Sequence, residues 1–443
     1  MGDITAFTIP YLSKVETQRL YQRLESVTYP NELPSPPTPW SYGVPKTAVD
    51  PILNHWRTKF DWKAQVDNIN RFKHFRTNVI PGDGQVHFIH ERGPEGSLPV
   101  LLLHGWPGCF YEFLGVLDRL KAQKAPLHLV VPSLPGFGYS DPPTRAGFGV
   151  AEMARTMNLL MLHLGYDKYV VQGGDWGSAI AKYLANTYSD HCIGQHVNFA
   201  FSPPPISLPE SFAPSAILTA LSPIWKHPVA VAKYMLAHFI AGYDVVYGPG
   251  TALALQESQF ILDEEAGYQR IQATKPTTLA WSVGDSPVGL MTWLLEKFHT
   301  WTYHPSEPAR PPKSMAPEQF QFQLAEEALP PTISMDDFLT IVMIYWTTNS
   351  AASSFRIYYE AAHLNERKTF WSSYPSPKGV EPPMGIAVFR KELRKPIREW
   401  AELHYNVASY REYEVGGHFA AFEEPDIMTE EIKSFAKLVR DRS

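Results

Sequence analysis

The stretch VVQGGDWGSAIA, Val170 to Ala181, decides the fold that we expect for this chain. An apolar run leads through two glycines to Asp175, and Trp, Gly and a small-residue helix start follow. This layout is typical of a sharp strand-to-helix turn that presents a nucleophile at the end of a strand. The alternative is that Asp175 caps the helix, because aspartate is a favoured N-cap residue. An N-cap residue does not need glycines on both sides, so the glycines around Asp175 favour its role as a nucleophile over its role as a cap.

Further apolar runs surround this stretch and end in turn residues. They are LPVLLLHGWPG, LHLVVPSLPGFGYSD, QHVNFAFSPPP, MGIAVFRKE and ASYREYEVGGH. Short unbroken apolar runs that alternate with helical patterns are typical of a parallel sheet covered on both faces. The sequence therefore predicts the α/β class with a mostly parallel central sheet.

Breaks in this pattern predict four regions. Residues 1–95 form an N-terminal meander with a first hairpin around Pro81-Gly82-Asp83-Gly84. Residues 96–205 and 336–443 form the two parts of the core, and residues 206–335, rich in aromatic and helical segments, form an inserted helical lid.

Composition limits the function classes. With 443 residues, 44% of them hydrophobic, the chain can bury a large core. A net charge of −6 offers no basic excess for nucleic acid or anionic lipid. Two cysteines, Cys109 and Cys192, make no disulfide framework and favour a reducing, cytoplasmic location. The N-terminal sequence has no apolar run long enough for a signal or membrane anchor, so we expect no membrane partner.

Three motifs supply candidate site residues. In HGWPG the backbone amide of Trp106, with that of Trp176 after the nucleophile, could bind an oxyanion, although a Gly-Pro turn plugged by an aromatic ring is the alternative. In GGHFAAFEEP, His418 follows the last strand, where an α/β-hydrolase fold places its base. Glu392, after the preceding strand, could orient His418, unless it is an ordinary surface acid.

An aspartate nucleophile implies a particular substrate chemistry. A carboxylate is ordinarily ionised near neutral pH and needs no base in order to attack. Attack on a saturated carbon gives an ester, which an activated water must then hydrolyse. That logic calls for an epoxide or a halide. No HExxH or CxxC motif occurs, and His87 and His90, three apart on an expected strand, point to opposite faces, so no metal site is expected.

These motifs, with YQRIQATKPTTLAWSVGDSPVGLMTWLLEKF and IVMIYWTTNSAASSFRIYYE, resemble the epoxide hydrolases of the microsomal type over nearly the whole chain. The resemblance implies the α/β-hydrolase fold, Asp175 as nucleophile, Glu392 as charge-relay acid and His418 as water-activating base. It also implies that Tyr268 and Tyr358 of the lid activate the epoxide, and we prefer Tyr358 to the adjacent Tyr359 for its spacing to Arg356.

The resemblance implies an apolar epoxide and water as partners, a diol product and no cofactor. Because no N-terminal anchor is visible, we expect the chain to resemble the soluble members, such as fungal ones. Four aromatic residues of the lid suggest an apolar pocket, with packing of the lid against the core as the alternative for most of them; they are Trp281, Trp293, Phe298 and Trp301. An epoxide-opening cyclase, a haloalkane dehalogenase or a non-catalytic binding protein remain alternatives. Whether the chain forms a homodimer is left open.

Overall fold

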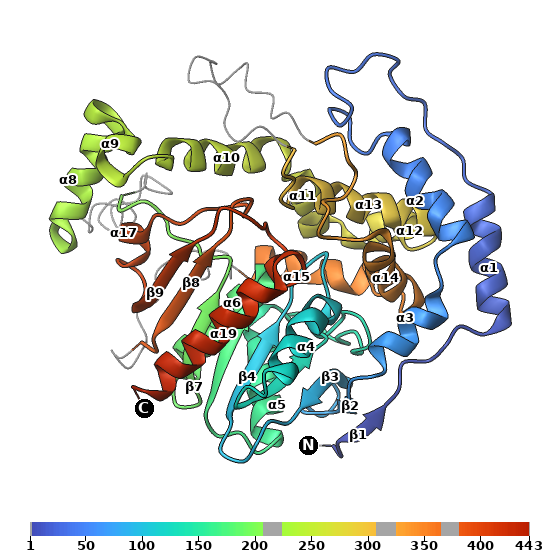
Figure 1. Ribbon diagram of the computed structural model, residues 1–443, viewed down its shortest axis with the longest axis horizontal. Coiled ribbons are helices and arrows are strands. Elements are labelled where there is room, and N and C mark those ends of the chain that lie inside the picture. Colours follow the sequence, from blue (N-terminus) through green and yellow to red (C-terminus); the bar gives the residue numbers. More distant parts are fainter. Residues whose placement is uncertain (1, 207–223, 307–324, 365–380, 443) are drawn as a thin grey trace.

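A nine-stranded sheet forms the centre of the computed structural model, which describes residues 2–206, 224–306, 325–364 and 381–442 (Figure 1). Its order is β1-β2-β3-β5-β4-β6-β7-β8-β9. The strands are β1 (Thr5–Phe7), β2 (His74–Thr77), β3 (Val86–Glu91), β4 (Leu98–Leu103), β5 (Leu127–Pro132), β6 (Tyr169–Gly173), β7 (Cys192–Val197), β8 (Met384–Val388) and β9 (Val407–Glu412).

The pairing of the strands confirms the expected architecture. Strands β4 to β9 pair in parallel, and β1, β2 and β3 add an antiparallel edge. The hairpin expected around Pro81-Gly82-Asp83-Gly84 is present, since Thr77 of β2 lies opposite Val86 of β3. The central strands are buried along their length, as unbroken apolar runs require when helices cover both faces.

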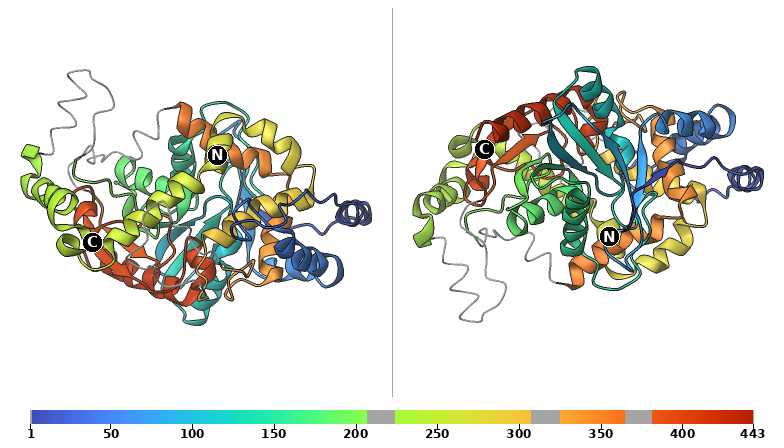
Figure 2. Two further views of the ribbon diagram at one scale, coloured as in Figure 1. Left: turned by 90° about the horizontal axis from the view of Figure 1, so that it is seen from above. Right: turned by 90° about the horizontal axis from the view of Figure 1, so that it is seen from below.

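Helices cover both faces of the sheet (Figure 2). Helices α4 (Leu114–Ala122) and α19 (Pro425–Arg440) pack together on one face, and α5 (Val150–His163) and α6 (Asp175–Thr187) pack together on the other. In α19 the buried residues Met428, Ile432, Phe435 and Val439 recur every three or four positions, which gives one apolar stripe toward the strands. Cys109 and Cys192 are free and buried, as expected of small apolar residues.

A helical layer lies beyond the carboxyl ends of the parallel strands (Figure 1). Its elements are α8 (Pro228–Leu236), a π-helical turn η2 (Ala237–Ala241), α9 (Tyr243–Tyr247), α10 (Thr251–Glu264), α11 (Gly267–Thr274), α12 (Pro276–Val283), α13 (Pro287–Thr300), α14 (Met335–Thr347) and α15 (Ala351–His363). Helix α14 packs on α13, and α15 packs on α11 and α12. The expected division at residue 336 stays a proposal. Parts of the expected lid and second core region, 207–223, 307–324 and 365–380, lie outside the described residues.

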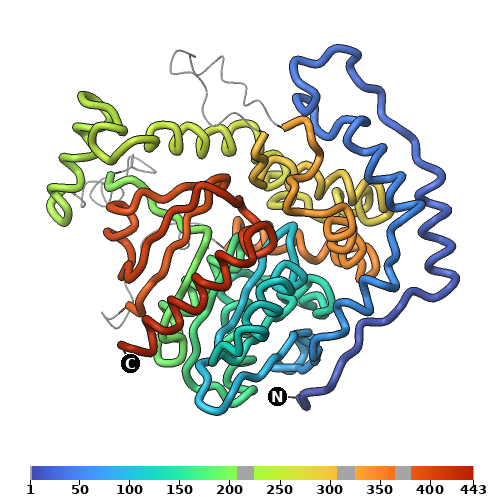
Figure 3. The backbone as a smooth tube through the Cα atoms, in the orientation of Figure 1, coloured from blue at the N-terminus to red at the C-terminus, as the bar shows by residue number. Residues whose placement is uncertain are grey.

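The N-terminal helices wrap the outside of this layer (Figure 3). They are α1 (Lys14–Glu25), α2 (Lys46–Thr58) and α3 (Trp62–Ile69). Helix α1 begins with a capping box, in which Ser13 and Glu16 each accept a hydrogen bond from the other's backbone amide. Helix α1 packs on α13, and α2 and α3 pack on α14, with Ile52 and Trp56 fully buried. The N-terminal region thereby braces the helices above the sheet.

Candidate active site

Asp175 lies at the sharp turn between β6 and α6. Its φ of 46° is in the left-handed region, which non-glycine residues rarely adopt and which is typical of a strained nucleophile turn. Helix α6 begins at Asp175 with Gly174 as its N-cap, and no side chain caps it, so the capping alternative is wrong. A Cβ on Gly177 would lie 2.2 Å from the carbonyl oxygen of Leu103, so only glycine lets α6 approach β4 this closely.

The HGWPG turn after β4 (Leu98–Leu103) holds the Asp175 carboxylate. The backbone amide of Trp106 donates a hydrogen bond to Oδ1 of Asp175 at 2.7 Å. A Cβ on Gly105 would lie 2.1 Å from the same oxygen, so glycine makes room for the carboxylate. His104 has a structural contact instead, because its Nε2 accepts a hydrogen bond from the amide of Leu134 at 3.0 Å. The turn therefore places one backbone donor on the Asp175 carboxylate, and its role toward an oxyanion stays a proposal.

His418 and Glu392 come together beside Asp175. Nδ1 of His418 lies 2.6 Å from Oε1 of Glu392, and Nε2 lies 3.3 Å from Oδ2 of Asp175. Both residues are buried, with 3% and 4% of their surface exposed, so Glu392 is not a surface acid. The backbone amide of His418 donates to the carbonyl of Trp301 at 2.9 Å, which ties the histidine loop to the end of α13.

The carboxylates on either side control the charge of His418. Burial alone would lower the pKa of His418, but Glu392 and Asp175 outweigh burial and raise the pKa to about 10. With Asp175 ionised, the imidazole is therefore protonated at neutral pH. Any reaction that neutralises Asp175 removes one of the two anions and lowers the pKa of His418.

Tyr268 of α11 and Tyr358 of α15 meet above Asp175. Their ring centroids are 5.8 Å apart, and both rings contact Trp106, at 5.1 and 5.9 Å. Tyr358 also lies edge-on to Trp176 at 4.8 Å. Burial, and then the Asp175 carboxylate, raise the pKa of Tyr268, so its hydroxyl keeps its proton. The choice of Tyr358 is supported, because Tyr358 is 3% exposed whereas Tyr359 is 38% exposed.

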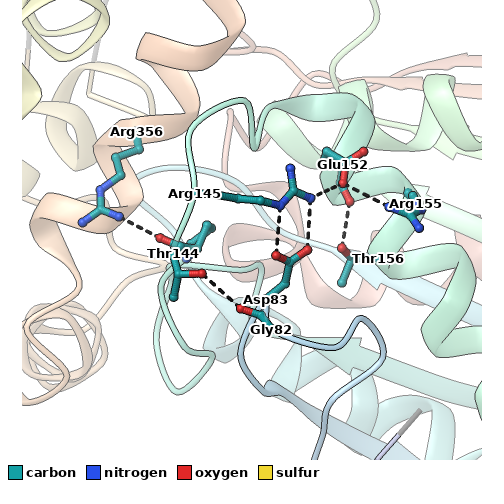
Figure 4. Close-up of polar contacts among 9 residues, drawn as sticks. Gly82, Asp83, Thr144, Arg145, Glu152, Arg155, Thr156 and Arg356 are labelled. Carbon is teal, nitrogen blue, oxygen red and sulfur yellow. Dashed lines mark hydrogen bonds and ion pairs between the residues drawn. The ribbon is translucent and has the colours of Figure 1, made fainter.

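Three contacts fix α15, and hence Tyr358, on the core. Arg356 donates to the carbonyl of Pro143 at 3.0 Å, Ser353 donates to the carbonyl of Gly136, and Glu360 accepts from the amide of Gly147. The loop that carries these partners is itself held by Arg145, which pairs with Asp83 of the β2–β3 hairpin and with Glu152 of α5 (Figure 4). The position of a tyrosine in the helical layer thus depends on the core beneath it.

The four aromatic residues expected around a pocket have different positions. Trp301 borders the site, with its ring centroid 5.1 Å from both Tyr268 and His418. Phe298 stacks on Phe419 beneath it. Trp281, however, is 79% exposed, so the expectation that it faces a pocket is wrong. Trp293 is partly buried and donates to Gln272 at 3.1 Å.

Sequence reasoning did not single out two buried acids of this region. Glu112 lies in a short 3₁₀ helix, η1 (Phe110–Phe113), just after HGWPG, and Glu423 lies in α18 (Ala420–Glu423), just after His418. Burial raises the pKa of each to about 8. Only their closeness to a site motif could have pointed to these acids, since Glu112 follows HGWPG by four residues and Glu423 lies within GGHFAAFEEP. Many surface acids lie as close to such motifs.

The chain is similar to known proteins in both its sequence and its fold. The chain matches the family described as Epoxide hydrolase N terminus over residues 4–113 and the alpha/beta hydrolase fold over residues 99–197. It is 31% identical to Epoxide hydrolase 1 of Sus scrofa over 97% of this chain and 88% of that protein. The crystal structure of juvenile hormone epoxide hydrolase from the silkworm Bombyx mori superposes with a TM-score of 0.79 at 28% identity, covering 100% of this chain and 96% of that one.

The fold also occurs in a fungal protein. The structure of Aspergillus niger epoxide hydrolase superposes with a TM-score of 0.74 at 24% identity, over 99% of this chain and 97% of that one. None of the helices in the described part of the chain combines the length and the apolar character needed to cross a membrane.

Proposed function

This chain belongs to the epoxide hydrolase family and is a hydrolase that acts on epoxides, and on that premise we propose that it works through a covalent ester on Asp175. The observation that supports this mechanism most strongly is the contact of one carboxylate with both an amide donor and a histidine. Trp106 binds Oδ1 at 2.7 Å, and His418 lies 3.3 Å from Oδ2. A residue that only capped a helix would need neither.

In the first step Asp175 opens the ring. Oδ1 is held by the amide of Trp106, which leaves Oδ2 to attack an epoxide carbon. The C–O bond of the ring breaks, and its oxygen takes a proton from Tyr268 or Tyr358, whose hydroxyls are neutral donors at this position. The products of this step are an alkyl ester of Asp175 and a free hydroxyl on the neighbouring carbon.

In the second step water cleaves the ester. Alkylation removes the charge of Asp175, so the pKa of His418 falls and the imidazole becomes able to accept a proton. His418, oriented by Glu392, deprotonates a water that attacks Cγ of Asp175. The amide of Trp106 then binds the oxyanion on Oδ1. The amide of Trp176, in the first turn of α6, is the second donor that we propose for this oxyanion. Cleavage of the ester releases a vicinal diol.

The alternatives fit the site less well. A haloalkane dehalogenase has no need of two phenol donors, and a binding protein has no need of the strained Asp175 turn beside His418. A cyclase would use a hydroxyl of the substrate in place of water, so its product would keep the mass of the substrate. The rings of Trp106, Trp301 and Tyr268 favour an apolar epoxide. The cytoplasmic location stays a prediction.

A single turnover in oxygen-18 water tests the covalent route. With enzyme in excess over an epoxide, the diol should contain no heavy oxygen, because its new oxygen comes from Oδ2 of Asp175. The peptide that carries Asp175 should gain one heavy oxygen, which mass spectrometry of a digest detects. Heavy oxygen in the diol of the first turnover would show direct hydration and would rule out the ester.

The two steps should respond differently to acid. Below the pKa of His418 in the ester state, the imidazole is protonated and cannot accept the proton of water, so ester hydrolysis should slow about tenfold for each pH unit. Ester formation uses no base, so the protonation of His418 should not slow it in the same way. Rapid quenching followed by intact-mass analysis should therefore show more ester as pH falls through the range in which His418 becomes protonated in the ester state. An ester fraction that did not change with pH would argue against His418 as the base.

A further inference from the structure

A small cavity lies beside Asp175 on the core side of the site. Its volume is about 20 Å³, which is enough for one water molecule. The residues around it that matter here are Gly108, Glu112, Asp175, Asn198 and His418. The cavity is therefore lined by the proposed nucleophile Asp175, by the proposed base His418 and by Glu112, an acid to which the mechanism above gives no role.

Glu112 directs an unpartnered oxygen into this region. The residue is 7% exposed, and its Oε1 has no hydrogen-bond partner among the described residues. A Cβ on Gly108 would lie 1.4 Å from Oε1, so glycine at this position is what admits the carboxyl group. A buried oxygen without a partner is unfavourable, so a bound hydrogen-bond donor is favourable here.

His418 presents the complementary atom. Its Nδ1 is bound by Glu392 at 2.6 Å, whereas Nε2 has no aligned hydrogen bond within the described part of the chain. Nε2 lies 3.3 Å from Oδ2 of Asp175, the oxygen assigned to the attack. Oε1 of Glu112 and Nε2 of His418 can therefore each form a further hydrogen bond, and both residues line a water-sized cavity beside the Asp175 ester that water must hydrolyse.

We propose that Glu112 is a further catalytic residue, which holds the hydrolytic water between Oε1 and Nε2 of His418. The inference rests on the proposed ester mechanism. The water donates one hydrogen to each of the two atoms, and this leaves a lone pair for Cγ of Asp175. His418 takes one proton as the water oxygen bonds to Cγ. The bond from Cγ to the ester oxygen Oδ2 then breaks, and Oδ2 leaves with that proton as the second hydroxyl of the diol. The other proton of the water returns to the tyrosine that gave its proton in the first step, which restores the Asp175 carboxylate with the oxygen of the water in it.

The charge of Glu112 suits this role. Burial, and to a smaller extent the Asp175 carboxylate, raise its pKa to about 8, although His418 acts in the opposite direction. At neutral pH the carboxyl group is therefore mostly protonated, and its carbonyl oxygen can still accept a hydrogen bond. A neutral acid also places no negative charge beside the oxyanion that forms on Asp175.

The test separates the two chemical steps. A Glu112→Leu variant fills the space without an acceptor, and we expect ester decay to slow by about 10- to 100-fold while ester formation changes by less than about threefold. Glu112→Gln keeps a carbonyl acceptor and should restore most of the decay rate. Both rates come from rapid quenching and intact-mass analysis of a single turnover, with styrene oxide or another aryl epoxide that the unmodified enzyme converts.

A matched control reports the general cost of losing a buried acid. Glu91, also 7% exposed, lies on β3 at the opposite end of the sheet and pairs with Lys121 at 3.0 Å. Glu91→Leu should leave the ratio of the two rates unchanged. If Glu112→Leu slows both steps equally, or neither, Glu112 does not hold the water. If the His418→Gln variant forms no ester at all, the proposed mechanism itself fails, which is a different outcome.

Discussion

Replacing His418 by glutamine is expected to leave the enzyme trapped as an ester on Asp175, with diol formation slower by on the order of 10³-fold or more. Glutamine cannot take a proton from water, so the ester step loses its base. The attacking oxygen needs no base, and the amide of Trp106 that holds the other oxygen is unaffected by the substitution. Ester formation should therefore persist while ester hydrolysis stops.

Mass spectrometry of the intact His418→Gln variant after incubation with aryl, terpenoid and aliphatic epoxides measures this directly. The mass should rise by that of one epoxide, and digestion should locate the adduct on the peptide that contains Asp175. A suitable control is His191→Gln, because His191 precedes β7 at the opposite end of the sheet and pairs with Asp167 at 3.2 Å. An adduct on any other residue, or diol formation without an adduct, would remove Asp175 from the role of nucleophile.

The sequence predicts the parts of this site that depend on neighbouring residues. The glycines around Asp175 and the apolar run before it belong to one turn, and local geometry demands both. His418 and Glu392 each follow a strand whose apolar pattern is visible, and parallel strands bring their carboxyl ends to one edge. Local turn and strand patterns, together with the rule that parallel strands end at one edge of the sheet, are therefore enough to predict that Asp175, Glu392 and His418 lie close together although they are far apart in the chain.

Other features depend on packing between distant segments and leave no local signal. Tyr268 and Tyr358 could be chosen among twenty-two tyrosines only through the family resemblance, since helix periodicity is the same for a core tyrosine and a functional one. Trp281 is exposed because α12 turns that side of the helix to solvent, which an apolar residue type does not reveal. Glu112 is buried only because Gly108 leaves space for it.

Removing both phenol hydroxyls from the helical layer is expected to slow ester formation by about 10³- to 10⁴-fold, the upper range for general acid catalysis. The single variants Tyr268→Phe and Tyr358→Phe should each cost about tenfold to 100-fold, because the remaining hydroxyl still donates to the epoxide oxygen. Phenylalanine keeps the ring contacts with Trp106, so the helices should stay in place. Ester decay should be unchanged, since the ring oxygen already carries its proton when water attacks.

The matched control is Tyr359→Phe, one residue along α15, whose ring is exposed and stacks on His363 at 3.9 Å. That variant should form and hydrolyse the ester at the rates of the unmodified enzyme. Single-turnover quenching measures the rates of ester formation and ester decay separately. For a more reactive epoxide with a better leaving oxygen, removal of the hydroxyls should slow ester formation less, because ring opening then depends less on proton donation. If the double variant forms ester at the unmodified rate, the proton comes from elsewhere, and the two phenols only line the pocket.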